Sequence, residues 1–122
     1  MAKILVIDDE KLVRLTVRQA LELAGHTVVE AEDGRDGVDV FIHHGPDLVI
    51  TDLIMPEQEG IATIGELRRA RADLPIIAMS GGGRNGNKDF LQAAAGLGAN
   101  RVVKKPFDVD ALMATVDEML AG

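Results

Sequence analysis

Acidic residues follow two short apolar runs in this chain. Asp8 and Asp9 come directly after Lys3–Ile7, and Asp52 ends a run that begins at Leu48. Unbroken apolar runs of this length are typical of strands buried on both faces, as in a parallel sheet. Because parallel sheets of this kind bind ligands at the carboxyl ends of their strands, we expect the three carboxylates to lie together there. Taken alone, Asp52 would be interpreted as a turn or helix cap, a common role of aspartate.

Two further polar side chains are expected at the same edge. Ser80 follows the apolar run Leu74–Met79, and Lys105 comes shortly after a strand at Asn100–Val103. Neighbouring carboxylates repel each other, and a hard divalent cation such as Mg²⁺ relieves the repulsion through oxygen ligands. The cation, the Lys105 ammonium and the Ser80 hydroxyl suit a phosphoryl group with charge spread over three oxygens. The residues therefore predict phosphoryl transfer, with Asp52 as the nucleophile that forms an aspartyl phosphate.

Apolar runs and helical stripes alternate along the chain, which predicts a doubly wound α/β fold. The expected strands are Lys3–Ile7, His26–Ala31, a run from Leu48 to Asp52, Leu74–Met79 and Asn100–Val103. The expected helices are Lys11–Ala24, a segment from Asp33–Gly34 to near Gly45, Glu57–Arg71, Lys88–Ala95 and a last helix capped by Asp108. Such alternation produces a five-stranded parallel sheet with helices on both faces, and the flavodoxin-like strand order 2-1-3-4-5 is its natural arrangement.

The expected helices carry apolar stripes that should face the sheet, since residues three and four apart share one side of a helix. The stripe residues are Leu12, Val13, Val17, Ala20, Leu21 and Ala24 in the first helix, Val38, Phe41 and Ile42 in the second, and Leu112, Met113, Val116, Met119 and Leu120 in the last. Gly25 stands where a glycine that ends a helix belongs. The cluster of Arg68, Arg69 and Arg71 is interpreted as the solvated face of the third helix.

Length and composition fit one soluble domain without covalent cross-links. The 122 residues are enough for a real core, and 47% hydrophobic with 27% charged residues is ordinary for a globular protein. The net charge of −7, from 13 basic and 20 acidic residues, argues against binding to nucleic acid or an anionic membrane. The absence of cysteine excludes disulfides and thiolate metal sites. We expect a single domain over residues 1–122, without an output domain and located in the cytoplasm.

Four short motifs stand in order where the expected strands end. They are VIDDE at residues 6–10, ITDLIMP at residues 50–56 with a glycine at position 60, MSG at residues 79–81 and KKPF at residues 104–107. Each motif is a weak signal alone. Together and in this order they make the whole chain resemble the receiver domain of response regulators, the CheY-like family of two-component signalling.

The resemblance implies a role for each residue of the expected site. It implies that Asp52 accepts a phosphoryl group from a histidine kinase or a phosphotransfer protein, and that Lys105 pairs with the phosphate. It also implies that Mg²⁺ is bound by Asp8, Asp9 and Asp52, together with the main-chain carbonyl of Ile54. The output would be a change in contacts with a protein target that the sequence does not identify, by a monomer or a homodimer.

The switch that reports phosphorylation departs from the family pattern. The resemblance implies that Ser80 is the hydroxyl that moves to the phosphoryl group. The family usually carries Tyr or Phe three residues before the lysine, where this chain has Val102, so the coupled swing lacks its ring. We expect the glycine-rich segment Gly81–Gly86 to be a loop that orders on phosphorylation or partner binding. The fourth helix, fifth strand and last helix form the expected partner surface, by resemblance.

Other interpretations remain beside the phosphoacceptor one. A degenerate receiver that acts as a phosphorylation-independent scaffold is favoured by Val102 and opposed by the intact site residues. A small phosphatase with Asp52 as nucleophile would require an acid two residues on, where Ile54 stands. The Gly81–Gly86 segment matches the dinucleotide pattern GxGxxG, but it follows the fourth strand and is interpreted as a surface loop. No convincing metal spacing relates the histidines, His26, His43 and His44.

Overall fold

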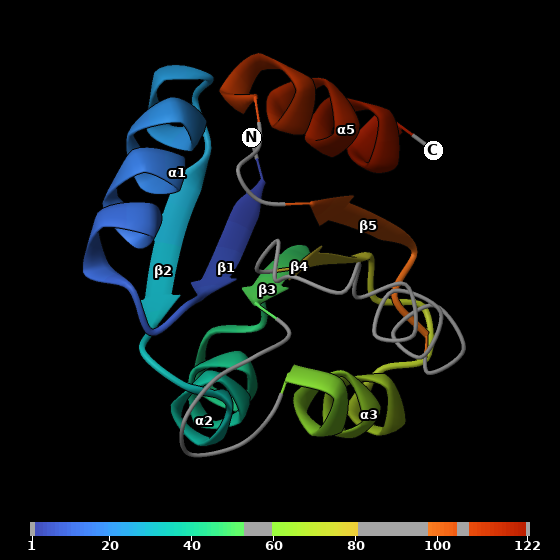
Figure 1. The fold of residues 1–122 in the computed structure, drawn as a ribbon. Helices are drawn as coiled ribbons and strands as arrows, with labels where there is room; N and C mark the ends of the chain where they lie inside the picture. The colour runs from blue at the N-terminus through green and yellow to red at the C-terminus, as the bar shows by residue number, and fades with distance from the viewer. Residues whose placement is uncertain (1, 53–59, 81–97, 105–107, 122) are drawn as a thin grey trace.

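A computed structural model describes residues 2–52, 60–80, 98–104 and 108–121 (Figure 1). The strands are β1 Lys3–Ile7, β2 Thr27–Ala31, β3 Leu48–Asp52, β4 Ile76–Ser80 and β5 Arg101–Lys104. The helices within these ranges are α1 Lys11–Leu23, α2 Gly34–His44, α3 Gly60–Ala70 and α5 Val109–Ala121. Where both ends of an element are described, its bounds differ from the predicted ones by no more than one or two residues, the usual uncertainty at element ends.

The strands form one parallel sheet in the order β2-β1-β3-β4-β5, which confirms the predicted flavodoxin-like arrangement. β1 therefore lies between β2 and β3, and Ile7 is the register partner of Thr51. Asp8 and Asp52 each stand one residue beyond this pair. Because the two strands run in the same direction, both aspartates come to the same edge of the sheet.

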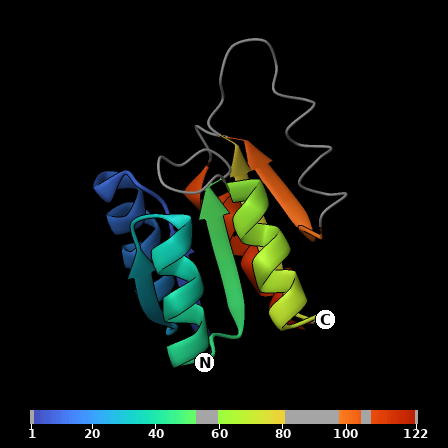
Figure 2. The same cartoon turned by 90° about the horizontal axis from the view of Figure 1, so that it is seen from below.

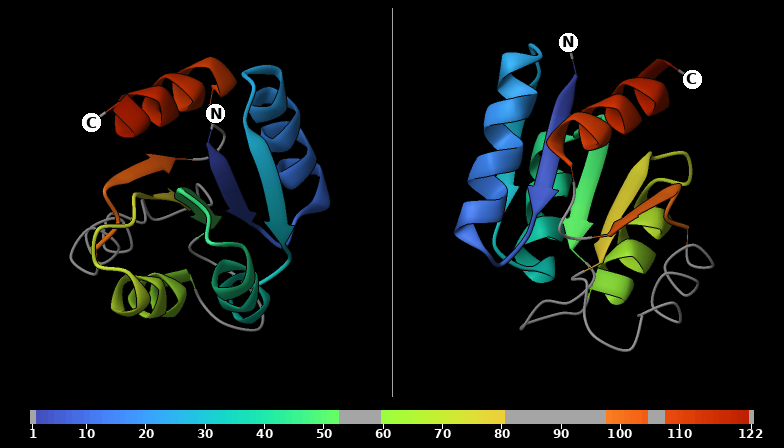
Figure 3. Two further views of the ribbon diagram at one scale, coloured as in Figure 1. Left: turned by 180° about the vertical axis from the view of Figure 1, so that it is seen from behind. Right: turned by 45° about the horizontal axis from the view of Figure 1, so that its top comes forward.

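Helices cover both faces of the sheet, with α1 and α5 on one face and α2 and α3 on the other (Figures 1 and 3). Figure 2, seen from below, shows the same layers with α2 and α3 nearest the viewer. The carboxyl ends of β1 and β3 lie between these two helix layers. The fold thus places the predicted site at one end of a three-layer sandwich.

Two apolar clusters, one on each face of the sheet, form the core. The cluster under α1 and α5 includes Ile4, Val6, Val17, Leu21, Leu48, Ile50, Leu112 and Val116. The cluster under α2 and α3 includes Leu5, Ile7, Phe41, Val49, Ile64, Leu67 and Ala78. Successive residues of β1 thus pack on opposite faces, and all five residues of β3 are buried. Burial on both faces explains why these strands are continuous apolar runs without polar alternation.

Three residues assigned to the apolar stripes, Leu12, Ala24 and Ile42, are exposed, so that part of the helix prediction was wrong. Leu12 is 76% exposed and Ile42 is 66% exposed. The buried stripe of α1 includes Arg14 and Val17, and Leu12 lies about 200° around the helix from Arg14. In α2 the buried residues include Phe41, and Ile42 is turned about 100° away from it toward solvent.

The helix ends follow the predicted chemistry of caps. Gly25, after α1, has φ 95°, and Gly45, after α2, has φ 57°, both in the left-handed region that favours glycine. The carboxylate of Asp33 accepts a hydrogen bond of 2.9 Å from the amide three residues on, at the start of α2. The carboxylate of Asp108 accepts one of 2.9 Å from the amide two residues on, at the start of α5. These caps set the directions in which the chain leaves the sheet and returns to it.

Two arginines of the expected solvated face make specific contacts, so that this interpretation of the cluster was wrong for them. Arg68 donates from Nη2 to the carbonyl oxygen of Gly98 and, at 3.1 Å, to Oδ1 of Asn100. Arg71 donates from Nη1 to the carbonyl oxygen of Pro46 at 2.9 Å. Long side chains at the end of α3 and just after it therefore tie this helix to the segments that lead into β5 and β3.

Some predicted elements lie outside the described residues. They are the Gly81–Gly86 loop, the Lys88–Ala95 helix and the first residues of the Glu57–Arg71 helix. Among the helices that the structure does describe, none combines the length and apolar character needed to cross a membrane. This finding agrees with the sequence, in which no apolar run approaches the length of a membrane span.

Candidate functional site

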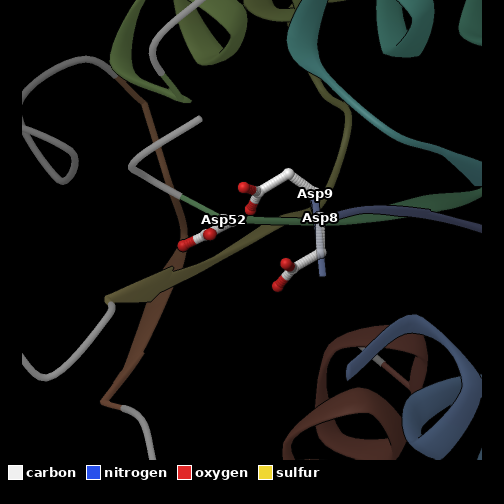
Figure 4. A group of neighbouring side chains, drawn as sticks. All are labelled: Asp8, Asp9 and Asp52. Atoms are coloured by element: carbon white, nitrogen blue, oxygen red, sulfur yellow. The ribbon is translucent and has the colours of Figure 1, made fainter. Parts of the chain in front are cut away.

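Three carboxyl groups gather between the ends of β1 and β3 (Figure 4). Asp8, Asp9 and Asp52 each offer one oxygen atom, and these atoms all lie within 4.8 Å of one another. Asp8 is 0% exposed and Asp52 is 4% exposed, whereas Asp9 is open to solvent. The structure therefore brings together the three acidic residues that the sequence predicted, in a site that reaches from the buried end of the sheet to the surface.

Hydrogen bonds hold Asp8 at three points. Its amide donates to the carbonyl oxygen of Ala31, at the end of β2, over 3.2 Å. Its Oδ1 accepts a bond of 2.8 Å from the amide of Glu10, and its carbonyl oxygen accepts one of 2.7 Å from Nη1 of Arg14. A side chain that binds the amide two residues on is the usual way for aspartate to build a tight turn. The same residue thus turns the chain from β1 into α1 and contributes an oxygen to the site.

Asp52 is fixed by its position in the middle of the sheet. It is the last residue of β3, which lies between β1 and β4, and its register partner on β4 is Met79. The hydroxyl of the buried Thr51 donates to the carbonyl oxygen of Asp52 over 3.1 Å. A central strand with a neighbour on each side leaves little freedom for the backbone at its end, so the carboxylate is presented in a defined place.

The donor set fits a hard divalent cation. All three side chains offer carboxylate oxygens, which are the ligands that Mg²⁺ prefers, and the exposed Asp9 leaves room for the waters that Mg²⁺ retains. Within the part of the chain that the structure describes, this trio is the group of acidic and histidine side chains with a spacing suited to a metal. A cation here would offset the mutual repulsion of the carboxylates.

The remaining predicted site residues are placed in part. Ser80 is the last residue of β4, one residue further along its strand than the register partner of Asp52. Ile54 and Lys105 lie outside the described residues, so their roles stay predictions. Val102, at the position of the usual aromatic residue, is half-buried and packs against the core cluster under α2 and α3.

An ion-pair cluster beside the site was not anticipated from the sequence. Glu30 of β2 accepts hydrogen bonds from Nη1 of Arg18 at 2.6 Å and from Nε of Arg14 at 3.0 Å. The bond from Arg18 is the main reason that the pKa of Glu30 lies below its ordinary value, with partial burial opposing it and Arg14 assisting. The signal in the sequence was an arginine within the apolar stripe of the first helix and a second arginine four residues later.

The histidines have local partners rather than metal-like neighbours. Nδ1 of His26 accepts a bond of 3.3 Å from the amide of Ala2, and Nδ1 of His43 lies 2.8 Å from the carbonyl oxygen of Asp39. His43 and His44 occupy the last turn of α2, where positive charge suits the helix dipole. These positions agree with their interpretation as strand-edge and helix-end residues.

Comparisons with known proteins all point to response regulators and their receiver domains. The sequence pattern of the response regulator receiver domain matches residues 4–117. Response regulator MprA of Mycolicibacterium vanbaalenii is 33% identical over 120 residues, which are 97% of this chain and 50% of that protein. Chemotaxis protein CheY of Bacillus subtilis is 34% identical over 120 residues, which are 97% of both proteins. The chain thus spans about half the length of the MprA relatives.

Solved structures share the fold. A response regulator receiver domain protein from Clostridium thermocellum has a TM-score of 0.91 at 28% identity, covering 99% of this chain and 95% of its own. Chemotaxis protein CheY4 of Vibrio cholerae has a TM-score of 0.87 at 28% identity, covering 98% of both chains. With the sheet order and the aspartate cluster, these matches show that the chain belongs to the response regulator receiver domain family, the CheY-like signalling modules of two-component systems.

Proposed function

We propose that this receiver domain is a phosphoacceptor that takes a phosphoryl group on Asp52 from a histidine kinase or a phosphotransfer protein. One observation carries the proposal: the buried Asp52 carboxylate lies with oxygens of Asp8 and Asp9 in a cluster no wider than 4.8 Å. The cluster stands at the carboxyl edge of a parallel sheet, where doubly wound folds bind their ligands. Membership of the family supports the donor, because response regulators work with histidine kinases.

The proposed reaction forms one bond and breaks another. A carboxylate oxygen of Asp52 attacks the phosphorus atom, while the bond from phosphorus to the donor's imidazole nitrogen breaks and its electron pair stays on that nitrogen. The product is an acyl phosphate on Asp52. Asp8, Asp9 and Asp52, with the main-chain carbonyl of Ile54, would hold Mg²⁺, which supplies positive charge for the phosphoryl oxygens.

Ser80 and Lys105 complete the proposed site. The Lys105 ammonium pairs with the charge of the phosphoryl group, and the Ser80 hydroxyl hydrogen-bonds to one of its oxygens. The Ser80 contact would pull on the end of β4, next to β5. Because Val102 stands on β5 and packs on the core, the signal would pass outward through aliphatic packing rather than through the rotation of a ring.

The wider role follows from the same site. We infer that residues 1–122 act as one receiver unit in the cytoplasm that changes its contacts with a protein target when Asp52 is phosphorylated. The net charge of −7 supports a protein target over nucleic acid or an anionic membrane. Both a monomer and a homodimer are compatible with this role.

A phosphorylation-independent scaffold is the second candidate function. Val102, in place of the usual aromatic residue, favours it, because a receiver without that ring lacks one known part of the switch. The assembled aspartates oppose it, since a scaffold has no need of three carboxylates at one point. A phosphatase is not supported, because Ile54 offers no general acid two residues after Asp52.

Incubation with acetyl phosphate and Mg²⁺, followed by intact mass spectrometry, tests the proposal. We expect the wild-type protein to gain one phosphoryl group, and the gain to disappear when EDTA removes the metal. Asp52→Asn should gain none, because the amide is not a nucleophile of this kind. Asp117→Asn, an exposed control on α5 with the same change of charge, should behave like the wild type.

Two results would contradict the proposal. Phosphorylation of Asp52→Asn at the wild-type level would place the acceptor elsewhere. A folded wild-type protein that binds Mg²⁺ but gains no phosphoryl group would favour the scaffold.

A further inference from the structure

Arg14 is a buried arginine whose guanidinium contacts the backbone of the site. It is 8% exposed and lies in the face of α1 that packs on the sheet, beside Val17 and Leu21. Its Nη1 donates to the carbonyl oxygen of Asp8 over 2.7 Å, and its Nε donates to Oε1 of Glu30 over 3.0 Å. One planar group thus bridges the end of β1, the start of α1 and β2.

The surroundings of Arg14 largely cancel its charge. Glu30 faces it at ion-pair distance, and Arg18 holds the second oxygen of the same carboxylate at 2.6 Å. Glu22 in turn pairs with Arg18 at 3.0 Å. The two arginines are therefore matched by two glutamates, and Arg14 brings little net positive charge to the aspartates. Its effect on them must come mainly from geometry.

We propose that Arg14 is a positioning residue for the metal site, which holds the Asp8 carbonyl so that the Asp8 and Asp9 carboxylates converge on Asp52. This inference rests on the proposed function, because it assumes Mg²⁺ at the three aspartates. Partners behind metal ligands commonly set metal affinity, with losses of about 10- to 100-fold when they are removed. Here the partner acts on the backbone of a ligand rather than on its side chain.

The two hydrogen bonds of Arg14, to Asp8 and to Glu30, require the planar guanidinium group of arginine. Its separate nitrogens donate to Asp8 and Glu30 at once, in one plane and at fixed spacing. Lysine has one ammonium on a flexible stem and cannot reproduce that arrangement. A role in charge alone would be filled by either residue, so Arg14→Lys separates positioning from charge.

Arg18 offers a matched control. In Arg14→Met, Glu30 keeps its bond from Arg18, and in Arg18→Met it keeps its bond from Arg14. Each substitution removes one arginine from the same carboxylate, but Arg14→Met also removes the bond to the Asp8 carbonyl. A difference between the two variants therefore reports on that bond.

Calorimetric titration with Mg²⁺ is the test, because the chain has no Trp or Tyr to report binding by fluorescence. We expect Arg14→Met to weaken Mg²⁺ binding about tenfold, Arg14→Lys to weaken it several-fold, and Arg18→Met to stay within about twofold of the wild type. Thermal unfolding of each variant shows that it is folded. If Arg14→Met does not fold, Arg14→Lys decides by the same comparison.

The outcomes distinguish this inference from the proposed function. Equal Mg²⁺ affinity in the wild type and the Arg14 variants would overturn the inference and leave the proposed function intact. Tighter binding in Arg14→Met would overturn it too, since that result is expected if a nearby positive charge repels the metal. An equal loss in Arg18→Met would assign the effect to Glu30 instead. Absence of Mg²⁺ binding in the wild type would overturn both claims.

Discussion

Glu30 is one residue through which the stability of this fold depends on pH. It accepts hydrogen bonds from Arg18 and Arg14, and these lower its pKa below the ordinary value of 4.5. A carboxyl group whose pKa is lower in the folded state than in the unfolded state binds protons less readily when folded. Its contribution to stability is therefore complete above the unfolded pKa and is lost as the pH falls through the folded pKa.

A pH series of urea unfolding measures this contribution. We expect Glu30→Gln to lower the free energy of unfolding by about 1–2 kcal/mol at pH 7, because hydrogen bonds between charged groups are lost. The difference from the wild type should be complete above the ordinary pKa of 4.5 and should shrink as the pH falls through the lowered pKa of folded Glu30. Glu22→Gln, at a more exposed ion pair, should have a much smaller effect. A difference that grows as the pH falls would contradict the assignment.

The types and order of the residues predicted the three aspartates of the site but not the arginine that bonds to the backbone of Asp8. Asp8, Asp9 and Asp52 were predictable because each stands at the carboxyl end of a strand or directly after it, and strand ends are fixed by topology. Arg14 was not, because an arginine among apolar helix positions can bury its stem and send its charged end in several directions. Its contact with the Asp8 carbonyl depends on the distance between β1 and α1, which no sequence pattern states.

At the scale of elements, the spacing of apolar residues predicted where the helices begin and end better than it predicted which of their faces is buried. Leu12 is apolar yet exposed, and Arg14 is charged yet buried. A prediction from apolar residues alone therefore placed the buried face of α1 at the wrong angle around the helix. The strands were predicted more reliably, because β1 and β3 are buried on both faces and carry no alternation that could be misread.

The end of α3 holds the connection into β5. Arg68 bonds the carbonyl oxygen of Gly98 and Oδ1 of Asn100, and the same Oδ1 accepts a bond of 2.9 Å from the amide of Ile76 at the start of β4. Another nitrogen of Arg68 bonds the carbonyl oxygen of Ala72, just after the helix. One side chain thus ties α3 to the entries of two strands at the edge opposite the aspartates.

Loss of this tie should destabilise the fold. We expect Arg68→Met to lower the free energy of unfolding by about 2 kcal/mol, because several carbonyl and amide oxygens lose a charged donor. Arg69→Met changes the exposed neighbour on the same helix and should stay within about 0.5 kcal/mol of the wild type. Urea unfolding at neutral pH measures both, and an effect of Arg68→Met as small as that expected of Arg69→Met would show that Arg68 belongs to the solvated face after all.

At the scale of the whole molecule, the alternation of strands and helices was enough to predict the architecture. Right-handed crossovers and burial of both sheet faces leave few arrangements for five such units. The order β2-β1-β3-β4-β5 then follows, and it places β1 beside β3. This adjacency is what assembles the site, because Asp52 is more than 40 positions away from Asp8 and Asp9 in the chain.

The distribution of function over the molecule follows from this order. The aspartates and Ser80 stand at the carboxyl edge, whereas the Arg68 tie stands at the other edge of the sheet. The residues of the proposed chemistry and the Arg68 contacts that stabilise the fold thus lie at opposite edges of the sheet. A substitution at Arg68 should therefore change stability with little effect on Mg²⁺ affinity. Val102, on β5, lies between these regions and packs on the core.

The central claim, that Asp52 is the phosphoacceptor, is tested most directly by identifying the phosphorylated residue chemically. Borohydride reduces an aspartyl phosphate to homoserine, so phosphorylated protein can be reduced, digested and sequenced by mass spectrometry. We predict homoserine at position 52, dependent on both acetyl phosphate and Mg²⁺, with Asp8 and Asp9 unchanged. Homoserine at Asp8 or Asp9, or at no position in a protein that has gained a phosphoryl group, would contradict the assignment of Asp52 as the acceptor.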